Sequence, residues 1–529
     1  MNEFNTPYQP IYTPLTKEPA NPAPNPDPPK TRTFTAVESV FAWISLIAGY
    51  IFCRVFPVKD NPFGGFVFIV SLFIITTVIL KFKGAKFHAM PILTSVFAII
   101  ISAALIISAN EFLYFFAYTF ALAAYCYFIY ANMGNSVKKG FSDLILADYI
   151  KALFVMPFCS MGQLFKGLFP SNGKSKGKFI LKLLIGIGLA IIPTSIVLVL
   201  LSYDKNFSAI IKNIFNFSFA DIFSHFISWG FAIPIGMYVF GLFISSAYKK
   251  CNDVLTEEVC SNISGKIKIA PAITVLAAVI PLICIYIIFF ISQWKYYVSG
   301  FTGVLPDEFS YAEYAREGFF QLCAVSVINL IIIIMTVLFM RCKNGRPPVL
   351  LKILSVIFSV FTLILISTAI SKMVMYIDIY GLTQKRVYAT WLMAVLAIIF
   401  ILIALKQFIP KLNAAAASIF VCVVLFAVLS LSNVDALIAR YNVNRYINGS
   451  LESVDVDALE DLGDAAIPEM VRLAEVLEDT DDKELYEDVN NKLFKAAARF
   501  ENDDKGIWSY TLPYIRAEKA LKNMGIISD

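Results

Sequence analysis

The sequence predicts an all-α membrane protein, a polytopic bundle of about eleven spanning helices followed by a small soluble helical domain. Of its 529 residues, 58% are hydrophobic and only 16% are charged, against roughly 25% charged residues in ordinary soluble domains. Forty-seven phenylalanines and a mean hydropathy of +0.70 agree with this. Apolar surface on that scale cannot be hidden inside a water-soluble core of this size, so lipid must cover it.

The predicted spans follow from length. A span needs about 20 apolar residues, because each helical residue rises about 1.5 Å and the hydrocarbon is about 30 Å thick. Eleven runs meet this requirement: 36–53, 63–80, 89–108, 112–132, 179–201, 221–247, 269–293, 318–340, 353–371, 388–405 and 413–432. Charges and Pro157 interrupt the apolar segment 143–169, so we expect an interfacial amphipathic stretch there, and a similar one at 207–219.

The chain divides into three predicted parts. Residues 1–33 hold nine prolines and almost no apolar run, which predicts a disordered or polyproline-like segment. This segment has no apolar core of the kind a signal peptide needs. Residues 36–432 form the membrane domain. Residues 433–529 are expected to form an acidic helical domain on the extracytoplasmic side.

Loop charge predicts the orientation. With the N-terminus inside, the inner segments carry 23 Lys and Arg residues and the outer loops carry nine. Basic residues concentrate in cytoplasmic loops of membrane proteins. An odd number of spans then places the C-terminal domain outside. The basic residues are explained by this rule, so they give no support to nucleic-acid binding.

The C-terminal segment has helical periodicity and a strongly negative charge. Residues 448–529 contain nine Lys or Arg and twenty Asp or Glu, a net charge of −11. Apolar residues recur at helical spacing in three stripes. The first stripe contains Leu459, Leu462, Met470, Val471, Ala474 and Leu477, the second Leu485, Val489, Leu493, Ala496 and Phe500, and the third Tyr514, Ala517, Leu521 and Met524. We therefore expect three short amphipathic helices.

Several kinds of site are excluded. Only two histidines occur, His88 and His225, too few for a His-rich iron or zinc centre. The segment GLFPSNGKS (167–175) has five residues between its glycines where a phosphate-binding loop requires four. Nine cysteines occur without CxxC spacing, and the loop pair Cys251 and Cys260 is expected to be free thiols. No cofactor and no metal is predicted.

Polar residues of interest gather on the predicted outer side. In the longest outer loop, Glu313 and Arg316 lie three residues apart and can pair on one helical face. Glu313 is the candidate catalytic acid or base. The candidate ligand-binding residues are Arg316, Tyr311, Tyr314, Tyr380, Arg386, Arg440, Tyr441 and Asp204.

Two interpretations of this outer face stand side by side. It can be an interfacial belt, in which Tyr, Trp and Arg anchor helices at the lipid headgroups and exposed ion pairs contribute little. It can also be a shared site for an anionic headgroup, peptide or polymer. Arg316, Arg386 and Arg440 would then clamp phosphate or carboxylate groups.

Three stretches resemble a known family: FSYAEYAREGFFQL (309–322), YGLTQKRVYATW (380–391) and ALIARYNVNRY (436–446). They are similar to bacterial multi-pass membrane proteins grouped as domains of unknown function, the forty-one-seventy-three and forty-one-fifty-three groups. The resemblance implies a protein of the bacterial plasma membrane and brings no established activity.

Three functions remain open. The first is a non-catalytic envelope sensor or scaffold whose external helical domain binds a protein partner. The second is a transporter or flippase in which the polar outer face is one end of a pathway. The spans hold few polar residues, of which Asn329 is the most notable. The third is a membrane enzyme acting on lipid-linked or cell-wall substrates.

Overall fold

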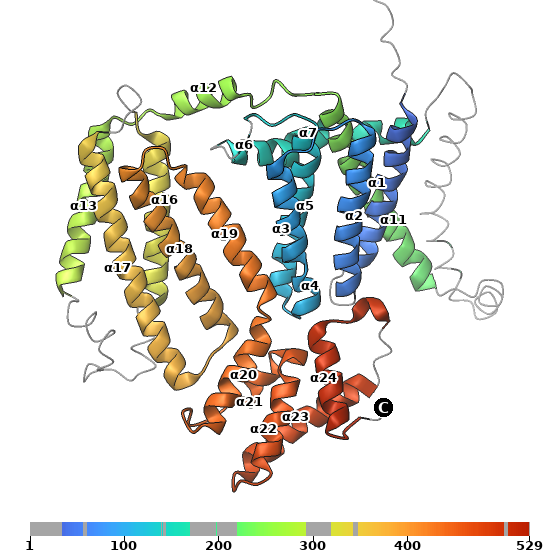
Figure 1. Cartoon of the computed structure of the whole chain (residues 1–529), viewed down its shortest axis with the longest axis vertical. Coiled ribbons are helices and arrows are strands. Elements are labelled where there is room, and N and C mark those ends of the chain that lie inside the picture. Colours follow the sequence, from blue (N-terminus) through green and yellow to red (C-terminus); the bar gives the residue numbers. More distant parts are fainter. Residues whose placement is uncertain are drawn as a thin grey trace, which may run out of the picture.

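Long helices lie side by side in this protein, and shorter helices lie at both ends of them (Figure 1). The computed structural model describes residues 34–56, 61–138, 140, 144–169, 197, 201, 219–292, 319–341, 348–501 and 506–527. Within these ranges the regular structure is helical, apart from one isolated bridge between Ala270 and Met340. The long apolar helices are α1 (Ala36–Val55), α2 (Pro62–Phe82), α3 (Ala89–Ser102) continued by α4 (Ala104–Ile107), α5 (Glu111–Asn132), α11 (Phe219–Ala247), α13 (Ala272–Ser292), α16 (Phe319–Phe339), α17 (Val349–Tyr380), α18 (Gln384–Phe408) and α19 (Ala414–Leu431).

The prediction of an all-helical polytopic membrane protein is confirmed. In the described residues, ten helices are long and apolar enough to cross a bilayer. Each of them coincides with one of the runs predicted from hydropathy. The remaining predicted run, 179–201, lies outside the described residues except for two positions. The proline-rich segment 1–33 also lies outside them, so its predicted disorder stays a prediction.

The membrane helices form two bundles. We call α1, α2, α3, α5 and α11 the first bundle, which shares one large apolar core. We call α13, α16, α17 and α18 the second bundle, which holds two smaller cores. Helix α19 lies between them, packing on α18 and on α3, and its Ala427 joins Ile101 and Ala117 in a small cluster of its own.

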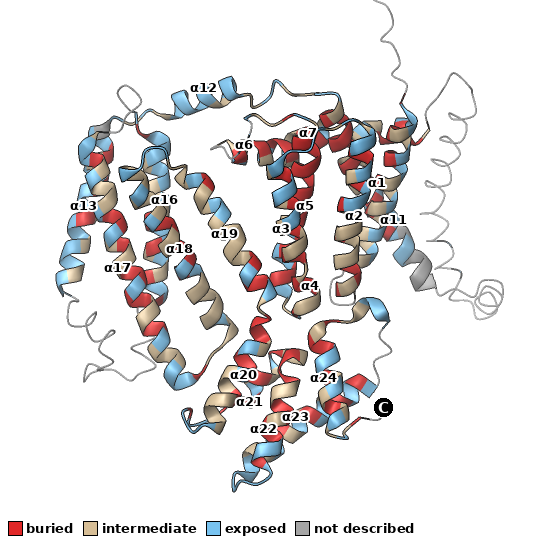
Figure 2. Ribbon diagram, viewed as in Figure 1, coloured by how far each residue is buried: buried red, intermediate tan, exposed pale blue. Residues whose placement is uncertain are grey.

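Packing is tightest around α5 and along the crossing of α1 with α11. In its most apolar stretch, 61% of the residues of α5 are buried, against 17% in α13. Figure 2 shows the same contrast, with buried positions concentrated on α5 and exposed ones along α13. At the crossing, a Cβ atom on Gly49 would lie 2.5 Å from the carbonyl oxygen of Ala232. A glycine there lets the two backbones approach closely, as small residues do between membrane helices.

The segment predicted to be interfacial is a broken helix. It runs through α6 (Ile145–Ile150), a π-helical turn (Lys151–Val155), α7 (Met156–Cys159) and, after a short 3-10 turn, α8 (Leu164–Leu168). Its two halves are bent by 46°. Figure 1 shows α6 and α7 at the same end of the bundle as α12 (Glu257–Ile267). We call this the α12 end, and the opposite end the tail end.

One predicted loop is wrong. Residues 372–387 were expected to form an outer loop, but α17 continues to Tyr380 and α18 begins at Gln384. Charged residues such as Lys372 lowered the hydropathy there, yet its side chain is fully buried within the bundle. The helix ends at Gly381, whose φ of +73° is a conformation that suits glycine.

Residues 433–529, which we call the tail, fold into more helices than predicted. The second and third predicted stripes correspond to α23 (Lys483–Glu501) and α24 (Leu512–Asn523). The first stripe is divided: Leu459 lies in α21 (Val456–Glu460), and Met470 to Leu477 lie in α22 (Ile467–Leu477). A further helix, α20 (Val434–Ile447), precedes them. Lys492 of α23 ion-pairs with Asp457 at 2.6 Å and Glu460 at 2.5 Å, which links α21 to α23 at the surface of the tail.

The apolar core of the tail continues into the membrane bundle. Ala104 of α4, Leu113 of α5 and Leu429 of α19 belong to the same cluster of buried residues as Val471 and Leu493. Figure 1 shows the tail helices at the ends of α4 and α19. The tail is therefore packed onto the bundle through apolar contacts as well as joined to it by the chain.

Candidate functional site

Four of the predicted site residues lie in the described part of the chain. Tyr380 ends α17, Arg386 lies in the first turn of α18, and Arg440 and Tyr441 lie on α20. The remaining candidates lie outside the described residues: Tyr311, Glu313, Tyr314, Arg316 and Asp204. The proposed catalytic acid and one of the three proposed clamps are thus among the positions about which the structure gives no information.

Arg386 is held at the end of α17. Its guanidinium donates hydrogen bonds to the carbonyl oxygen of Tyr380 at 2.8 Å and to that of Gly381. It also lies over the ring of Tyr376, 4.2 Å from the ring centroid. A cation at a helix C-terminus compensates the unpaired carbonyls and the negative end of the helix dipole. These contacts give Arg386 a structural role at the turn between α17 and α18.

Helix α20 binds the same turn through an amide. The Asn442 side chain accepts a hydrogen bond from the backbone N–H of Leu382 at 2.7 Å and donates one to the carbonyl of Leu382 at 2.8 Å. Gly381 leaves room for this contact, because a Cβ atom there would lie 2.7 Å from Asn442 Oδ1. Both backbone groups of Leu382 are therefore satisfied by one side chain from the tail.

Arg445 adds an ion pair to this interface. Its guanidinium lies 3.2 Å from the Asp378 carboxylate of α17 and donates to the Tyr441 hydroxyl at 3.2 Å. Of the two α20 residues predicted for the site, Tyr441 therefore takes part in this network, whereas Arg440 is exposed. We call Asp378, Leu382, Tyr441, Asn442 and Arg445 the α17–α20 contact.

A buried carboxylate lies beside this contact. Asp435, in the first turn of α20, is 2% exposed and accepts a hydrogen bond from the Gln384 side chain at 2.8 Å. Burial raises the pKa of Asp435, and hydrogen bonds from Gln384 and Asn110 offset part of that rise. Sequence reasoning missed Asp435, although a single acid next to the apolar end of a span is a visible signal.

The tail also contacts the first bundle. Trp508, in the 3-10 turn η4 (Ile507–Ser509), stacks on Phe63 of α2 with ring centroids 6.0 Å apart. Helix α24 lies against α4. Together with the α17–α20 contact, these interactions attach the tail to both bundles at the tail end of the molecule.

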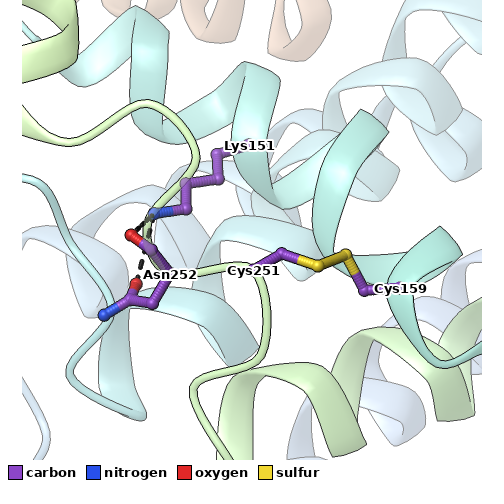
Figure 3. Close-up of a disulfide and its surroundings, with 4 residues drawn as sticks. All are labelled: Lys151, Cys159, Cys251 and Asn252. Carbon is purple, nitrogen blue, oxygen red and sulfur yellow. Dashed lines mark hydrogen bonds between the residues drawn. A yellow bond between two sulfur atoms is a disulfide. The ribbon is translucent and has the colours of Figure 1, made fainter. Parts of the chain in front are cut away.

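The α12 end carries a disulfide. Cys159, the last residue of α7, is bonded to Cys251 in the loop after α11, and the residues are 92 positions apart in sequence (Figure 3). The prediction of a free thiol at Cys251 is therefore wrong. It failed because α7 packs across α11, which brings two segments together that no local spacing relates.

The broken helix at this end carries two buried charged side chains. Lys151 is 1% exposed and donates from Nζ to the backbone carbonyl of Asn252 at 2.9 Å and to its side-chain oxygen at 3.2 Å (Figure 3). Asp148, one turn earlier and 2% exposed, accepts from the Tyr130 hydroxyl at 3.1 Å and from the Val137 N–H at 2.8 Å. These contacts fix the broken helix to α5 and to the loop after α11.

Asn329 forms a polar network in the second bundle. Its side-chain oxygen accepts from the Tyr286 hydroxyl of α13 at 2.5 Å, and its amide donates to the Thr362 hydroxyl of α17 at 2.9 Å. Three helices are thus joined by one fully buried amide. Such bonds hold membrane helices together. Helix packing is therefore enough to explain why these polar side chains are buried here.

The described surface includes a hollow in the tail and another at the α12 end. One, of about 320 Å³, lies in the tail and is lined by Phe500, Glu501, Tyr514, Glu518, Lys522 and Ile527. The other, of about 200 Å³, lies at the α12 end near His88 and Tyr127. Among the described residues, no group of three or more His, Cys, Asp or Glu side chains is arranged to hold a metal ion.

Comparison with known proteins gives a family. No curated protein matches the chain, and no solved structure matches it. A family model described as Domain of unknown function (DUF4153) matches residues 95–473. This range extends from within α3 to α22, so it includes the second bundle, α19, the α17–α20 contact and the beginning of the tail. The match covers more than half of the 529 residues, and this integral membrane protein therefore belongs to the DUF4153 family.

Proposed function

We propose that this protein is a sensor or scaffold of the bacterial cell envelope, whose acidic tail binds a protein partner and links the two membrane bundles. The observation that carries the proposal is the attachment of the tail to both bundles. Asn442 and Arg445 hold it to the second bundle, and Trp508 holds it to the first. A partner that moves the tail would therefore act on both bundles at once.

The loop between α22 and α23 is the best partner surface on charge grounds. Glu478, Asp479 and Asp481 in this loop are exposed. Figure 1 shows the loop at the end of the tail farthest from the bundles. Since residues 448–529 carry a net charge of −11, the partner surface is expected to be basic, and opposite charge would speed association.

The proposed orientation has the N-terminus inside and the tail outside. The excess of Lys and Arg in the predicted inner segments supports it, with 23 basic residues there against nine in the predicted outer loops. The disulfide between Cys159 and Cys251 also lies at the α12 end, whereas structural disulfides persist in oxidising compartments. The charge excess comes from many loops, whereas the disulfide is a single feature. In this orientation the two cysteines face a reducing compartment.

Photo-crosslinking in intact cells tests the partner proposal. A benzophenone amino acid is placed at Phe494, which is 59% exposed on α23, and for comparison at Ile288, which is 66% exposed on the membrane helix α13. We expect a discrete protein adduct at position 494 and none at 288. The adduct should be lost when Glu478, Asp479 and Asp481 are changed to Gln, Asn and Asn.

A matched control uses basic residues of the same tail. Arg516 and Lys519 on α24 are exposed, and changing both to Gln should leave the adduct in place. The identified partner must also be required for the envelope phenotype that deletion of this chain produces. The proposal fails if the acidic-loop variant keeps both the adduct and the wild-type phenotype.

The broken helix favours a second candidate, a transporter or flippase. Broken helices and π-helical turns recur at functional sites of membrane proteins. Here the segment from Ile145 to Leu168 combines both with the buried charges Asp148 and Lys151. This arrangement supports a pathway that passes the α12 end.

Lipid transfer in proteoliposomes tests the second candidate. The probe is a fluorescent NBD-labelled phosphatidylethanolamine, whose outer-leaflet fraction is bleached by dithionite. A flippase should speed loss of the protected fraction, and Lys151→Met should abolish the effect while Lys166→Met, at an exposed position of α8, should not. Equal bleaching with and without protein argues against lipid transfer.

A further inference from the structure

Two large apolar side chains of the tail are left exposed next to a membrane helix. Ile507 is 70% exposed and Trp508 is 54% exposed, although the apolar stripes of α22, α23 and α24 are buried in the core of the tail. Both residues belong to the turn η4, which contacts α2. Exposed apolar side chains of this size beside a membrane helix indicate a surface that another molecule covers.

The position of the pair relative to α2 identifies the covering medium. Trp508 stacks on Phe63, the second residue of α2, with an angle of 24° between the rings. Gly64 lies against the same indole, since a Cβ atom there would be 3.8 Å from Cε3 of Trp508. Helix α2 is a candidate membrane span of 21 residues that begins at Pro62, so its first turn lies where the hydrocarbon meets the headgroups.

The surface next to the pair continues along α2. Ile74 lies 11 residues after Phe63, close to the same face of the helix. Ile74 and Val78 are 58% and 49% exposed. A ring at this level meets acyl chains on one side and headgroups on the other. Tryptophan suits that boundary because it joins a large apolar face to one N–H donor.

We propose that Ile507 and Trp508 insert into the headgroup region of the bilayer and anchor the tail to the lipid surface. The occupant of this surface is lipid, because the patch is continuous with exposed apolar side chains of the spans. The tail is then held in two ways, by protein contacts at α17–α20 and by lipid at η4. This proposal does not depend on the partner discussed above.

Tryptophan fluorescence can test the anchor directly. The chain has five tryptophans, and Trp508 is the one in the tail. Changing Trp43, Trp229, Trp294 and Trp391 to Phe leaves Trp508 as the sole emitter in nanodiscs. We expect strong quenching by lipids labelled near the headgroup, weaker quenching by lipids labelled at the chain end, and little quenching by aqueous iodide.

A relocated tryptophan provides the matched control. In the same background, Trp508→Phe combined with Phe494→Trp places the emitter on an exposed face of α23. This emitter should be quenched by iodide and not by the lipids. If the fourfold variant fails to fold, the difference in lipid quenching between the wild-type chain and Trp508→Phe gives the same information.

Two outcomes would overturn the proposal. Quenching of Trp508 by iodide with no effect of labelled lipids would place the ring in water. Protection of Trp508 from both kinds of quencher would mean that protein, rather than lipid, covers the patch.

Discussion

Asn442 satisfies both backbone groups of Leu382, accepting from its N–H at 2.7 Å and donating to its carbonyl at 2.8 Å. One side chain of the tail thereby completes the turn between two membrane helices. The arrangement ties the conformation of this turn to the presence of α20 beside it.

Replacing Asn442 should loosen the tail. Asn442→Ala removes both bonds and leaves two partly buried backbone groups unpaired, which costs about 1–3 kcal/mol. We expect a lower unfolding temperature in nanodiscs and faster amide hydrogen exchange at Leu382. Asn448→Ala, at an exposed position beyond the end of the same helix, should change neither. Equal effects of the two substitutions would contradict the role assigned to Asn442.

Asp435 should make stability depend on pH. Burial raises its pKa in the folded state, so the folded protein holds this proton more tightly than the unfolded chain. The stability linked to that proton is therefore present at low pH and is lost as the pH rises from the ordinary aspartate range through the raised folded-state pKa. Asp435→Asn should remove this contribution while its amide oxygen still accepts from Gln384.

The comparison is made between pH 4 and pH 8. The unfolding temperature of Asp435→Asn, relative to wild type, should increase with pH in that window. Asp461→Asn, at an exposed position after α21, serves as the control and should follow wild type. A constant difference between Asp435→Asn and wild type at every pH would rule out titration of this group.

Asn329 should hold the second bundle together. Asn329→Ala removes its bonds to Tyr286 and Thr362, and hydrogen bonds between membrane helices contribute about 0.6 kcal/mol on average and up to about 1.7 kcal/mol. The measurement is the unfolding free energy in mixed detergent micelles, with Ile328→Ala as control because Ile328 faces outward. In a double-mutant cycle, Asn329→Ala and Thr362→Val together should lower the unfolding free energy by less than the sum of their separate effects. Additive effects would contradict a bond between the two side chains.

Labelling of Cys159 and Cys251 should report the orientation. With the α12 end inside, the disulfide-bonded pair lies on the cytoplasmic side. A membrane-impermeant reductant and maleimide applied to intact cells should therefore leave both residues unlabelled, and the same reagents should label them after lysis. Peptide mass spectrometry distinguishes these sites from the other seven cysteines. Labelling of either residue in intact cells would contradict the proposed orientation.

Hydropathy predicted the membrane helices well because their signal is local. A run of apolar residues identifies a span without knowledge of its neighbours, and the stripes in α22, α23 and α24 carry the same kind of information. The end of α17 was missed since Lys372 and Asp378 lower the hydropathy, although the helix continues through them. Hydropathy measures how strongly a segment prefers lipid to water. A helix such as α17 can continue past the end of the segment that hydropathy identifies.

The contacts of the site depend on information that is not local. Cys159 meets Cys251 across 92 residues, and Asn442 meets Leu382 across 60. Nothing in the sequence around either partner specifies the other. Arg386 was predicted as a ligand clamp from its charge, and the structure adds that its guanidinium binds the end of α17. The proposed action of Arg316 and Glu313 at the predicted outer face stays a hypothesis from the sequence.

The length of α17 has a consequence for how the protein fits its membrane. Its 32 residues extend about 48 Å at 1.5 Å per residue, well beyond the roughly 30 Å of hydrocarbon. A helix too long for its bilayer tilts or protrudes, and its far end carries the turn to which Asn442 is bound. A thicker bilayer would let α17 stand more upright and move that turn relative to the short helix α4, on which the tail also rests. Membrane thickness would thus act as a mechanical input that the tail converts into a change of its own position.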